Sequence, residues 1–280
     1  MKDFPVGLCW GTIHRASLAE TIELAGRHGF PTIAVSPHIH ADSIADGLSE
    51  QALRRHLQDA GVSVRVIDCI AAGLPGMPPG DTKFGGRTIA QADAETCFRV
   101  AEALEAPVVN ISLYNSEVVP VAEMAEAVGA ICRQAATRGM AIAIEFYPES
   151  GIRDLAQAHA IARTCGEANC GVMLDTWHLA RSGGTVADIA ALPPDAITAF
   201  QLSDRTEPPP GTPYVPMTGR RLPGEGELPL DEIVSAALAN SPGITMELEV
   251  FSEELRAMPL EDSVARIASA VRSWKEKLAA

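Results

Sequence analysis

The stretch VAEMAEAVGAICRQAATRGMAIAIEF, residues 121–146, decides the fold of this chain. Its first part spaces apolar residues as one face of a helix does, and Gly139 then follows as a helix terminator. The apolar run 140–146 has the length of one buried strand. A helix that ends in glycine directly before a buried strand is typical of α/β proteins. We therefore predict α/β architecture from this stretch.

The same alternation extends to both ends of the chain, and the helical patterns 17–29 and 48–61 also end in glycine. Eight strand-like runs cover residues 5–10, 32–37, 62–70, 107–114, 140–146, 170–175, 197–203 and 244–251. The last pattern, 260–280, is an amphipathic helix. Eight strands alternating with helices predict a single-domain (β/α)8 TIM barrel over residues 1–280. A doubly wound sheet is the alternative, but no G-x-G-x-x-G follows the first strand.

Composition limits the partners and the location of the chain. Of its 280 residues 47% are hydrophobic, enough for a sizeable core, and the formal net charge is −14. Such an acidic chain is repelled by nucleic acid and by anionic membranes. We expect a cytoplasmic protein without a signal peptide or membrane span, because the start MKDFPVGLCWG lacks the regions of a leader. The six cysteines are scattered without C-x-x-C, so we expect neither a disulfide framework nor a zinc cluster.

Four polar residues end four neighbouring apolar runs: Glu145, Asp175, Gln201 and Glu249. In a barrel the carboxyl ends of adjacent strands meet on one face, so these side chains are expected to converge. Three carboxylates and an amide oxygen suit one divalent cation, whereas a lone strand-end acid more often bonds loop amides or arginine. Glu247 is a second candidate on the last strand, but Glu249 lies nearer the rim and is the predicted ligand.

Several motifs resemble the xylose isomerase-like superfamily of sugar phosphate isomerases and epimerases, which includes AP endonuclease family 2. The motifs are D-T-W-H (175–178), Q-L-S-D (201–204), R-x-x-P-G-E-G (220–226) and L-E-V-F-S (248–252). The resemblance covers essentially the whole chain. It implies a TIM barrel with one divalent cation, often Mn²⁺, with Mg²⁺, Co²⁺ and Zn²⁺ as alternatives. The implied ligands are Glu145, Asp175, Gln201 and Glu249.

The resemblance also implies roles around the metal. His178 would contact substrate oxygens or transfer protons, and either Arg220 or Arg221 could pair with an anionic substrate group; we assign this contact to Arg221. Gln201 stands where D-tagatose 3-epimerases usually have histidine. In this it resembles the 3-dehydroshikimate dehydratases, in which glutamine can take that position. A homodimer or homotetramer is possible for barrels of this type.

The predicted function is a metal-dependent isomerase or epimerase of a small sugar or hydroxy-ketone. Glu145 and Glu249 would act as the acid/base pair, removing a proton α to a carbonyl through a metal-stabilised enediolate. A lyase of the 3-dehydroshikimate dehydratase type, with His178 as base, is the alternative. An AP endonuclease is disfavoured by the acidic charge and by missing histidine and aspartate ligands. A non-catalytic sugar-binding barrel is disfavoured because all four ligand positions carry oxygen donors.

Overall fold

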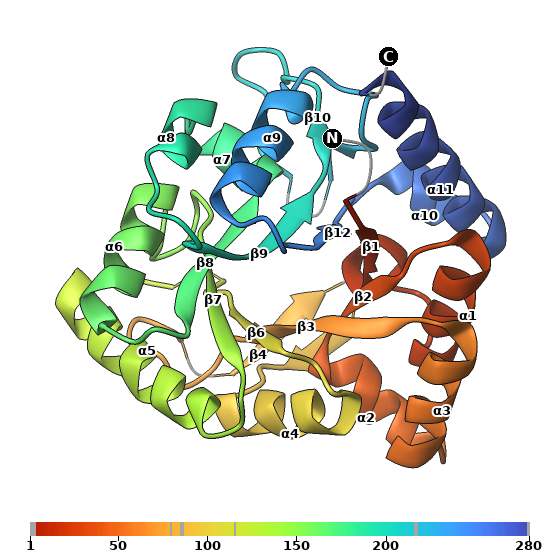
Figure 1. The fold of residues 1–280 in the computed structure, drawn as a ribbon, viewed down its shortest axis with the longest axis horizontal. Coiled ribbons are helices and arrows are strands. Elements are labelled where there is room, and N and C mark those ends of the chain that lie inside the picture. The colour runs from red at the N-terminus through yellow and green to blue at the C-terminus, as the bar shows by residue number, and fades with distance from the viewer. Residues whose placement is uncertain (1–3, 79, 85–86, 115, 216–217, 279–280) are drawn as a thin grey trace.

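Eight parallel strands close into one barrel in the computed structural model, which describes residues 4–78, 80–84, 87–114, 116–215 and 218–278 (Figure 1). The strand order around the barrel is β1-β12-β9-β8-β7-β6-β3-β2. The strands are β1 (Val6–Cys9), β2 (Thr32–Val35), β3 (Ser63–Ile70), β6 (Val108–Ile111), β7 (Ala141–Glu145), β8 (Cys170–Asp175), β9 (Ile197–Leu202) and β12 (Met246–Leu248). Each lies inside one of the eight predicted runs, so the predicted (β/α)8 TIM barrel is confirmed.

Helices surround the barrel on its outside (Figure 1). They are η1 (Trp10–Ile13), α1 (Leu18–His28), α2 (Pro37–Ala45), α3 (Glu50–Ala60), α4 (Ala94–Leu104), α5 (Val121–Ala136), α6 (Leu155–Cys165), α7 (Thr176–Arg181), α8 (Val186–Ala190), α9 (Leu230–Asn240), α10 (Glu253–Ala257) and α11 (Leu260–Lys277). Local sequence sets their ends. Ser17 and Glu20 form a capping box at the start of α1, and Gly29 ends it in the left-handed conformation, φ 81°. None of the helices described here is long and apolar enough to cross a membrane.

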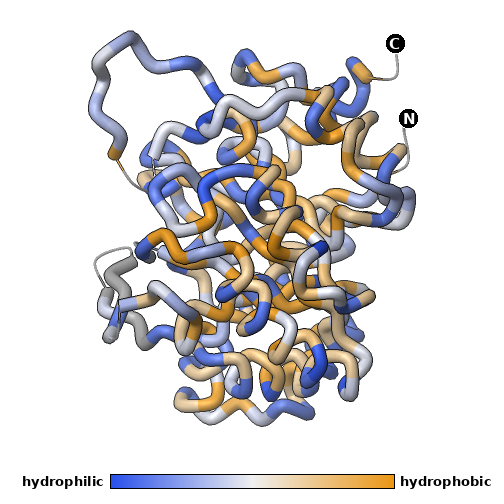
Figure 2. The backbone as a smooth tube through the Cα atoms, turned by 90° about the vertical axis from the view of Figure 1, so that its left-hand side faces the viewer, coloured by the Kyte–Doolittle hydropathy of each residue, from blue (hydrophilic) through white to orange (hydrophobic). Residues whose placement is uncertain are grey.

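Strand residues alternate between two environments. On β7, Ile142 and Ile144 are fully buried between the barrel and its helices, whereas Ala143 and Glu145 alternate with them and face the barrel interior. Figure 2 shows that hydrophobic residues are frequent along the segments inside the molecule. The outward faces of the strands therefore build the core, which leaves the inward faces available for small or polar side chains.

Two segments between barrel strands and the helices that follow them, 73–86 and 205–229, contain short strands. In the first, β4 (Asp81–Phe84) pairs antiparallel with β5 (Arg87–Ala90), just beyond the loop. In the second, β10 (Asp204–Arg205) pairs antiparallel with β11 (Arg220–Arg221). Each pairing satisfies backbone groups that an open loop would leave to water. Both segments follow the carboxyl ends of barrel strands, β3 and β9.

Candidate metal and active site

The four predicted ligand positions come together at the carboxyl ends of adjacent strands. Glu145 ends β7, Asp175 ends β8, Gln201 lies next to the end of β9, and Glu249 follows β12 directly. All four side chains are buried, at 5% exposure or less. Asp175 and Gln201 are direct neighbours in the β8–β9 register. The structure therefore gathers residues that lie more than a hundred positions apart in the sequence.

The contacts among these residues leave oxygen lone pairs unused. Gln201 Nε2 donates to Glu249 Oε1 at 3.1 Å, while the buried Gln201 Oε1 has no hydrogen-bond partner. Glu145, Asp175 and His178 each offer one ligand atom, and these atoms lie within 4.8 Å of one another. An unpaired buried amide oxygen beside several carboxylates is what a cation site requires.

Arg220 reaches the centre of this group from β11. Its Nη1 lies 2.8 Å from Asp175 Oδ2 and 2.8 Å from Glu249 Oε2, and also donates to the Glu249 carbonyl oxygen at 3.0 Å. Its Nη2 lies 3.3 Å from Nε2 of His178. The guanidinium also lies over the ring of Phe251, 4.9 Å from its centroid. Arg220 is thus a buried cation that faces several acids.

The acids respond in different ways to this environment. Burial alone would raise the pKa of Asp175, but the charges of Arg220 and His178 and their hydrogen bonds bring it below its usual value. Burial raises the pKa of Glu249 well above its ordinary range despite Arg220, and the nearby charges of Glu145 and Asp175 add to this rise. Asp175 is therefore held as a carboxylate, while Glu249 binds a proton readily.

Arg221, predicted to contact substrate, is exposed, whereas its neighbour Arg220 is only 5% exposed. Consecutive residues of a strand point to opposite sides, so only one of the two arginines can reach the acids. The sequence could not distinguish them because both stand in the same motif. The structure joins Arg220 to the site, and a substrate contact of Arg221 stays a prediction.

His178 is placed by the turn that follows β8. Asp175 caps α7, because its Oδ1 accepts a hydrogen bond from the His178 backbone N–H at 3.0 Å. The ring Nε2 then lies 3.5 Å from Glu145 Oε1. Its other nitrogen, Nδ1, is buried without a hydrogen-bond partner, and the ring packs beside Tyr147 with centroids 5.3 Å apart. The D-T-W-H motif thus places the ring of His178 beside the carboxylates of Glu145 and Asp175.

Two further candidates for the site, Asp68 on β3 and Asn110 on β6, were not identified from the sequence. Asn110 Nδ2 donates to Asp68 Oδ1 at 2.8 Å and to Glu145 Oε2 at 2.9 Å. Trp10 Nε1 donates to the other Asp68 oxygen at 3.1 Å. Burial, together with the charge of Glu145, raises the pKa of Asp68 to about 6. The available signal was a polar residue inside each of the apolar runs 62–70 and 107–114.

The two glutamates of the last strand occupy different depths. Glu247 Oε1 accepts a hydrogen bond from Thr32 Oγ1 at 3.1 Å, and its Oε2 has no hydrogen-bond partner. Glu249 instead meets Gln201, Arg220 and the thiol of Cys9, whose Sγ lies 3.5 Å from Glu249 Oε1. Only Glu249 therefore joins the other candidate ligands, as expected from its position near the rim.

The Q-L-S-D and R-x-x-P-G-E-G motifs meet at Asp204. Its carboxylate accepts hydrogen bonds from four backbone N–H groups, those of Arg205, Gly224, Gly226 and Leu228, at 2.8–3.1 Å. At Gly226 a Cβ would stand 2.4 Å from Asp204 Oδ1, so a side chain there would displace this carboxylate. The two motifs together fix the base of the loop that delivers Arg220.

Comparison with known proteins identifies the family of this chain. Residues 22–277 match the family described as xylose isomerase-like TIM barrel. The chain belongs to this family.

The most similar relatives and structures differ in how much of the chain they cover. An inosose isomerase of Halalkalibacterium halodurans is 24% identical over 128 residues, so the chain matches only 45% of that relative's length and 45% of its own. The crystal structure of the IOLI protein, with a bound zinc atom, shares 16% identity and a TM-score of 0.79, covering 98% of this chain and 99% of that one. A protein assigned as the 3-DHS dehydratase AsbF of Bacillus anthracis shares 16% identity and a TM-score of 0.71, covering 96% and 98%. At these identities the two structures demonstrate a common fold.

Proposed function

We propose that this chain is a divalent-metal-dependent isomerase or epimerase, and that its substrate is a small sugar or cyclic polyol ketone of the inosose class. The observation that supports this most is the convergence of Glu145, Asp175, Gln201 and Glu249 at the mouth of a barrel of this family. The similarity to inosose isomerases suggests the substrate class.

The residues present fit a cation on two grounds. Gln201 Oε1 is a buried acceptor without a hydrogen-bond partner. In the described part of the site, the carboxyl groups of Glu145, Asp175 and Glu249 surround the guanidinium of Arg220, and a bound cation would balance their negative charge when all three are ionised. We assign the metal to these three acids and Gln201. Hard oxygen donors favour Mn²⁺ or Mg²⁺, with Co²⁺ and Zn²⁺ as alternatives.

A cation bound here would supply Lewis acidity to substrate carbonyl and hydroxyl oxygens. Proton transfer at carbon is assigned to Glu145 and Glu249, which come from opposite sides of the group, on β7 and after β12. Asn110 holds one oxygen of Glu145 and leaves the other, Oε1, facing His178.

Arg220 and His178 are assigned to the substrate's oxygen atoms. Arg220 is anchored by Asp175 and Glu249 and still presents Nη2 near His178 Nε2. Trp10 and Trp177, each 7% exposed, would exclude water from the same region. This set can orient a polyhydroxy ketone while the two glutamates act on its α-carbon.

The test is exchange of substrate hydrogen with solvent deuterium. Purified full-length protein loaded with Mn²⁺ is mixed with an inosose in heavy water, and the α-position is followed by NMR. We expect exchange and formation of an isomer in wild type, and neither in Glu249→Gln. Glu247→Gln is the matched control, because one Glu247 oxygen accepts a hydrogen bond from Thr32 and the other has no hydrogen-bond partner. Exchange that persists in Glu249→Gln would reject the assigned pair.

A lyase of the 3-dehydroshikimate dehydratase type is the second candidate. It is favoured by Gln201 and by the buried guanidinium of Arg220, which could bind a substrate carboxylate. His178 would then be the base that starts elimination of the hydroxyl group. Ultraviolet absorption of the aromatic product from 3-dehydroshikimate would identify this activity, and deuterium exchange into inosose without it would exclude it.

A further inference from the structure

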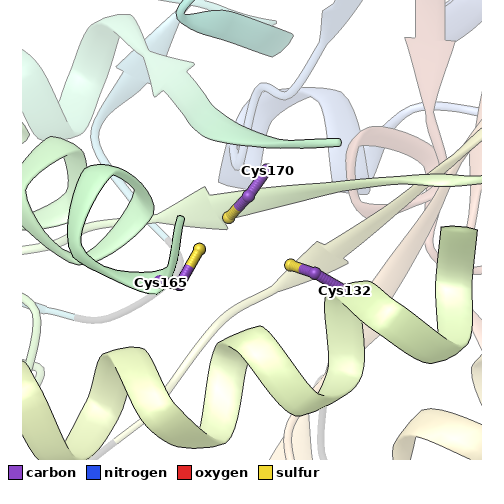
Figure 3. A group of neighbouring side chains, drawn as sticks. All are labelled: Cys132, Cys165 and Cys170. Carbon is purple, nitrogen blue, oxygen red and sulfur yellow. The ribbon is translucent and has the colours of Figure 1, made fainter. Parts of the chain in front are cut away.

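Three thiols meet on the outside of the barrel: Cys132 of α5, Cys165 at the end of α6 and Cys170 at the start of β8. Their sulfur atoms all lie within 4.8 Å of one another. Figure 3 shows the three side chains pointing toward a common space between the two helices and the strand. All three are free thiols. The sequence predicted neither a disulfide framework nor a zinc cluster, and it is the fold, not the spacing, that brings Cys132 to the other two.

The loop between α6 and β8 holds two of these thiols in place. Gly166 ends α6 in the left-handed conformation, φ 73°, and the Cys170 N–H donates to the Glu167 carbonyl oxygen at 3.2 Å. Asn169 Nδ2 donates at 2.9 Å to the carbonyl oxygens of both Cys132 and Met140. The loop is thereby tied to α5 at the residue that carries the third thiol. A site whose ligands are fixed in advance loses little entropy when it binds.

This cluster is separate from the oxygen-rich site. Cys170 and Asp175 are the first and last residues of β8, and five steps of about 3.3 Å place them roughly 16 Å apart along the strand. The thiols lie at the amino end of the strand and the carboxylates at its carboxyl end. The thiols and the carboxylates are too far apart to bind the same ion.

We propose that Cys132, Cys165 and Cys170 form a second metal site, which binds a soft, thiophilic cation such as Zn²⁺ or Cd²⁺. Zinc–sulfur bonds of about 2.3 Å in a tetrahedral site place sulfur atoms roughly 3.8 Å apart, so small rotations of the side chains would complete the site. Each thiol gives up its proton to solvent when it binds. Cys165 and Cys170 are partly exposed, which provides an entry path and room for water as a fourth ligand.

The surroundings of the thiols support this chemistry. Glu167, held by Arg133 at 2.8 Å, places a carboxylate beside the cluster. Because the ligands come from α5, α6 and β8, a bound cation would link these three elements and stabilise the fold.

The test is a Cd²⁺ titration of the full-length chain, reduced with a phosphine, followed by ultraviolet thiolate–Cd²⁺ absorption and by thermal unfolding. We expect the absorption of three thiolates to saturate at one equivalent of Cd²⁺ in the thiol site, and a higher Tm. Cys165→Ala and Cys170→Ala should each weaken binding by about 100-fold or more, since even loss of outer contacts costs 10–100-fold. The matched control is Cys97→Ala, a buried thiol of α4 outside the cluster, which should bind as wild type does.

Three results would overturn the proposal. One is unchanged Cd²⁺ affinity in both Cys165→Ala and Cys170→Ala. Another is loss of the thiolate absorption in Cys9→Ala, which would place the ion beside Glu249 at the other end of the barrel. The third is a protein that shows four titratable thiols before reduction and binds no Cd²⁺ after it, which would indicate a disulfide in place of a metal site.

Discussion

The two ends of β8 carry side chains of different chemical character, and we propose a metal site at each. At its carboxyl end Asp175 stands among carboxylates, an amide oxygen and an imidazole, all buried. At its amino end Cys170, itself partly exposed, stands beside the buried thiol of Cys132 and the partly exposed thiol of Cys165. Oxygen donors select hard cations and sulfur donors select soft ones. One six-residue strand can therefore separate two ions by chemistry as well as by distance.

The two ends also differ in what maintains them. The oxygen end holds excess negative charge, which Arg220 only partly balances. The thiol end is neutral while its thiols keep their protons, and it acquires charge only when a cation arrives. Repulsion between like charges therefore destabilises the oxygen end, whereas the thiol end has no such repulsion. Variants that alter one end and leave the other unchanged measure this difference.

The largest effect is expected for Glu249→Gln. Removing one acid/base carboxylate should lower kcat/KM for the proposed exchange reaction roughly 10²–10⁴-fold and weaken Mn²⁺ binding. Thiolate–Cd²⁺ absorption at the thiol end should stay as in wild type. Simultaneous loss of both signals would mean that the two ends of β8 are coupled, contrary to the comparison.

Arg220→Lys should have the next largest effect. A lysine cannot contact two carboxylates and His178 at once, and breaking a buried ion pair costs about 3–5 kcal/mol. We expect a rise in KM of about 100-fold. Arg221→Lys is the matched control, because an exposed side chain contributes within about 0.5 kcal/mol. Equal effects of the two substitutions would restore Arg221 as the substrate contact.

Asp204→Ala should unfold the base of the loop between β10 and β11. It removes the acceptor of four backbone N–H groups, so the free energy of unfolding should fall by about 2–3 kcal/mol. Urea denaturation measures this loss. Asp231→Ala, at the first turn of α9, serves as a control whose hydrogen bond to Trp274 is single. Full stability of Asp204→Ala would show that the loop is held by other contacts.

The smallest effect, and one that depends on pH, is expected at Glu247, deep in the barrel. Burial raises its pKa from 4.5 to about 7, so the folded protein holds this proton more tightly than the unfolded chain does. Its contribution to stability is therefore complete below about pH 4.5 and is lost as pH rises toward 7. Glu247→Gln should raise Tm by a few degrees at pH 8 and leave it nearly unchanged at pH 4. A variant less stable than wild type at pH 8 would contradict this.

The fold followed from the sequence because its signals are local. Apolar runs of strand length and glycines after helices define each unit, and Gly29 and Gly61 end α1 and α3 as predicted. The four strand-end residues converge for the same reason, since position on a strand fixes position on the barrel face.

The missing parts of the site depend on contacts that no local pattern encodes. Arg220 reaches Asp175 only because β11 folds back onto β10, and the motif alone does not say which of two adjacent arginines turns inward. Asp68 and Asn110 are polar residues inside apolar runs. The sequence does not show that Asn110 contacts both Asp68 and Glu145. Cys132 joined Cys165 and Cys170 across two helices, at a sequence separation that motif reading does not cover.

The hydrogen bonds of Asp204 divide the loop between β10 and β11 into a fixed base and an exposed segment. Its base is tied to the barrel and carries Arg220, whereas residues 206–215 are exposed, with the ring of Tyr214 against the guanidinium of Arg181. Sequence can therefore change in the exposed segment without moving the guanidinium that the site uses. A designer who wants a different substrate could exchange this segment between relatives as a cassette, and natural drift within the family has the same freedom.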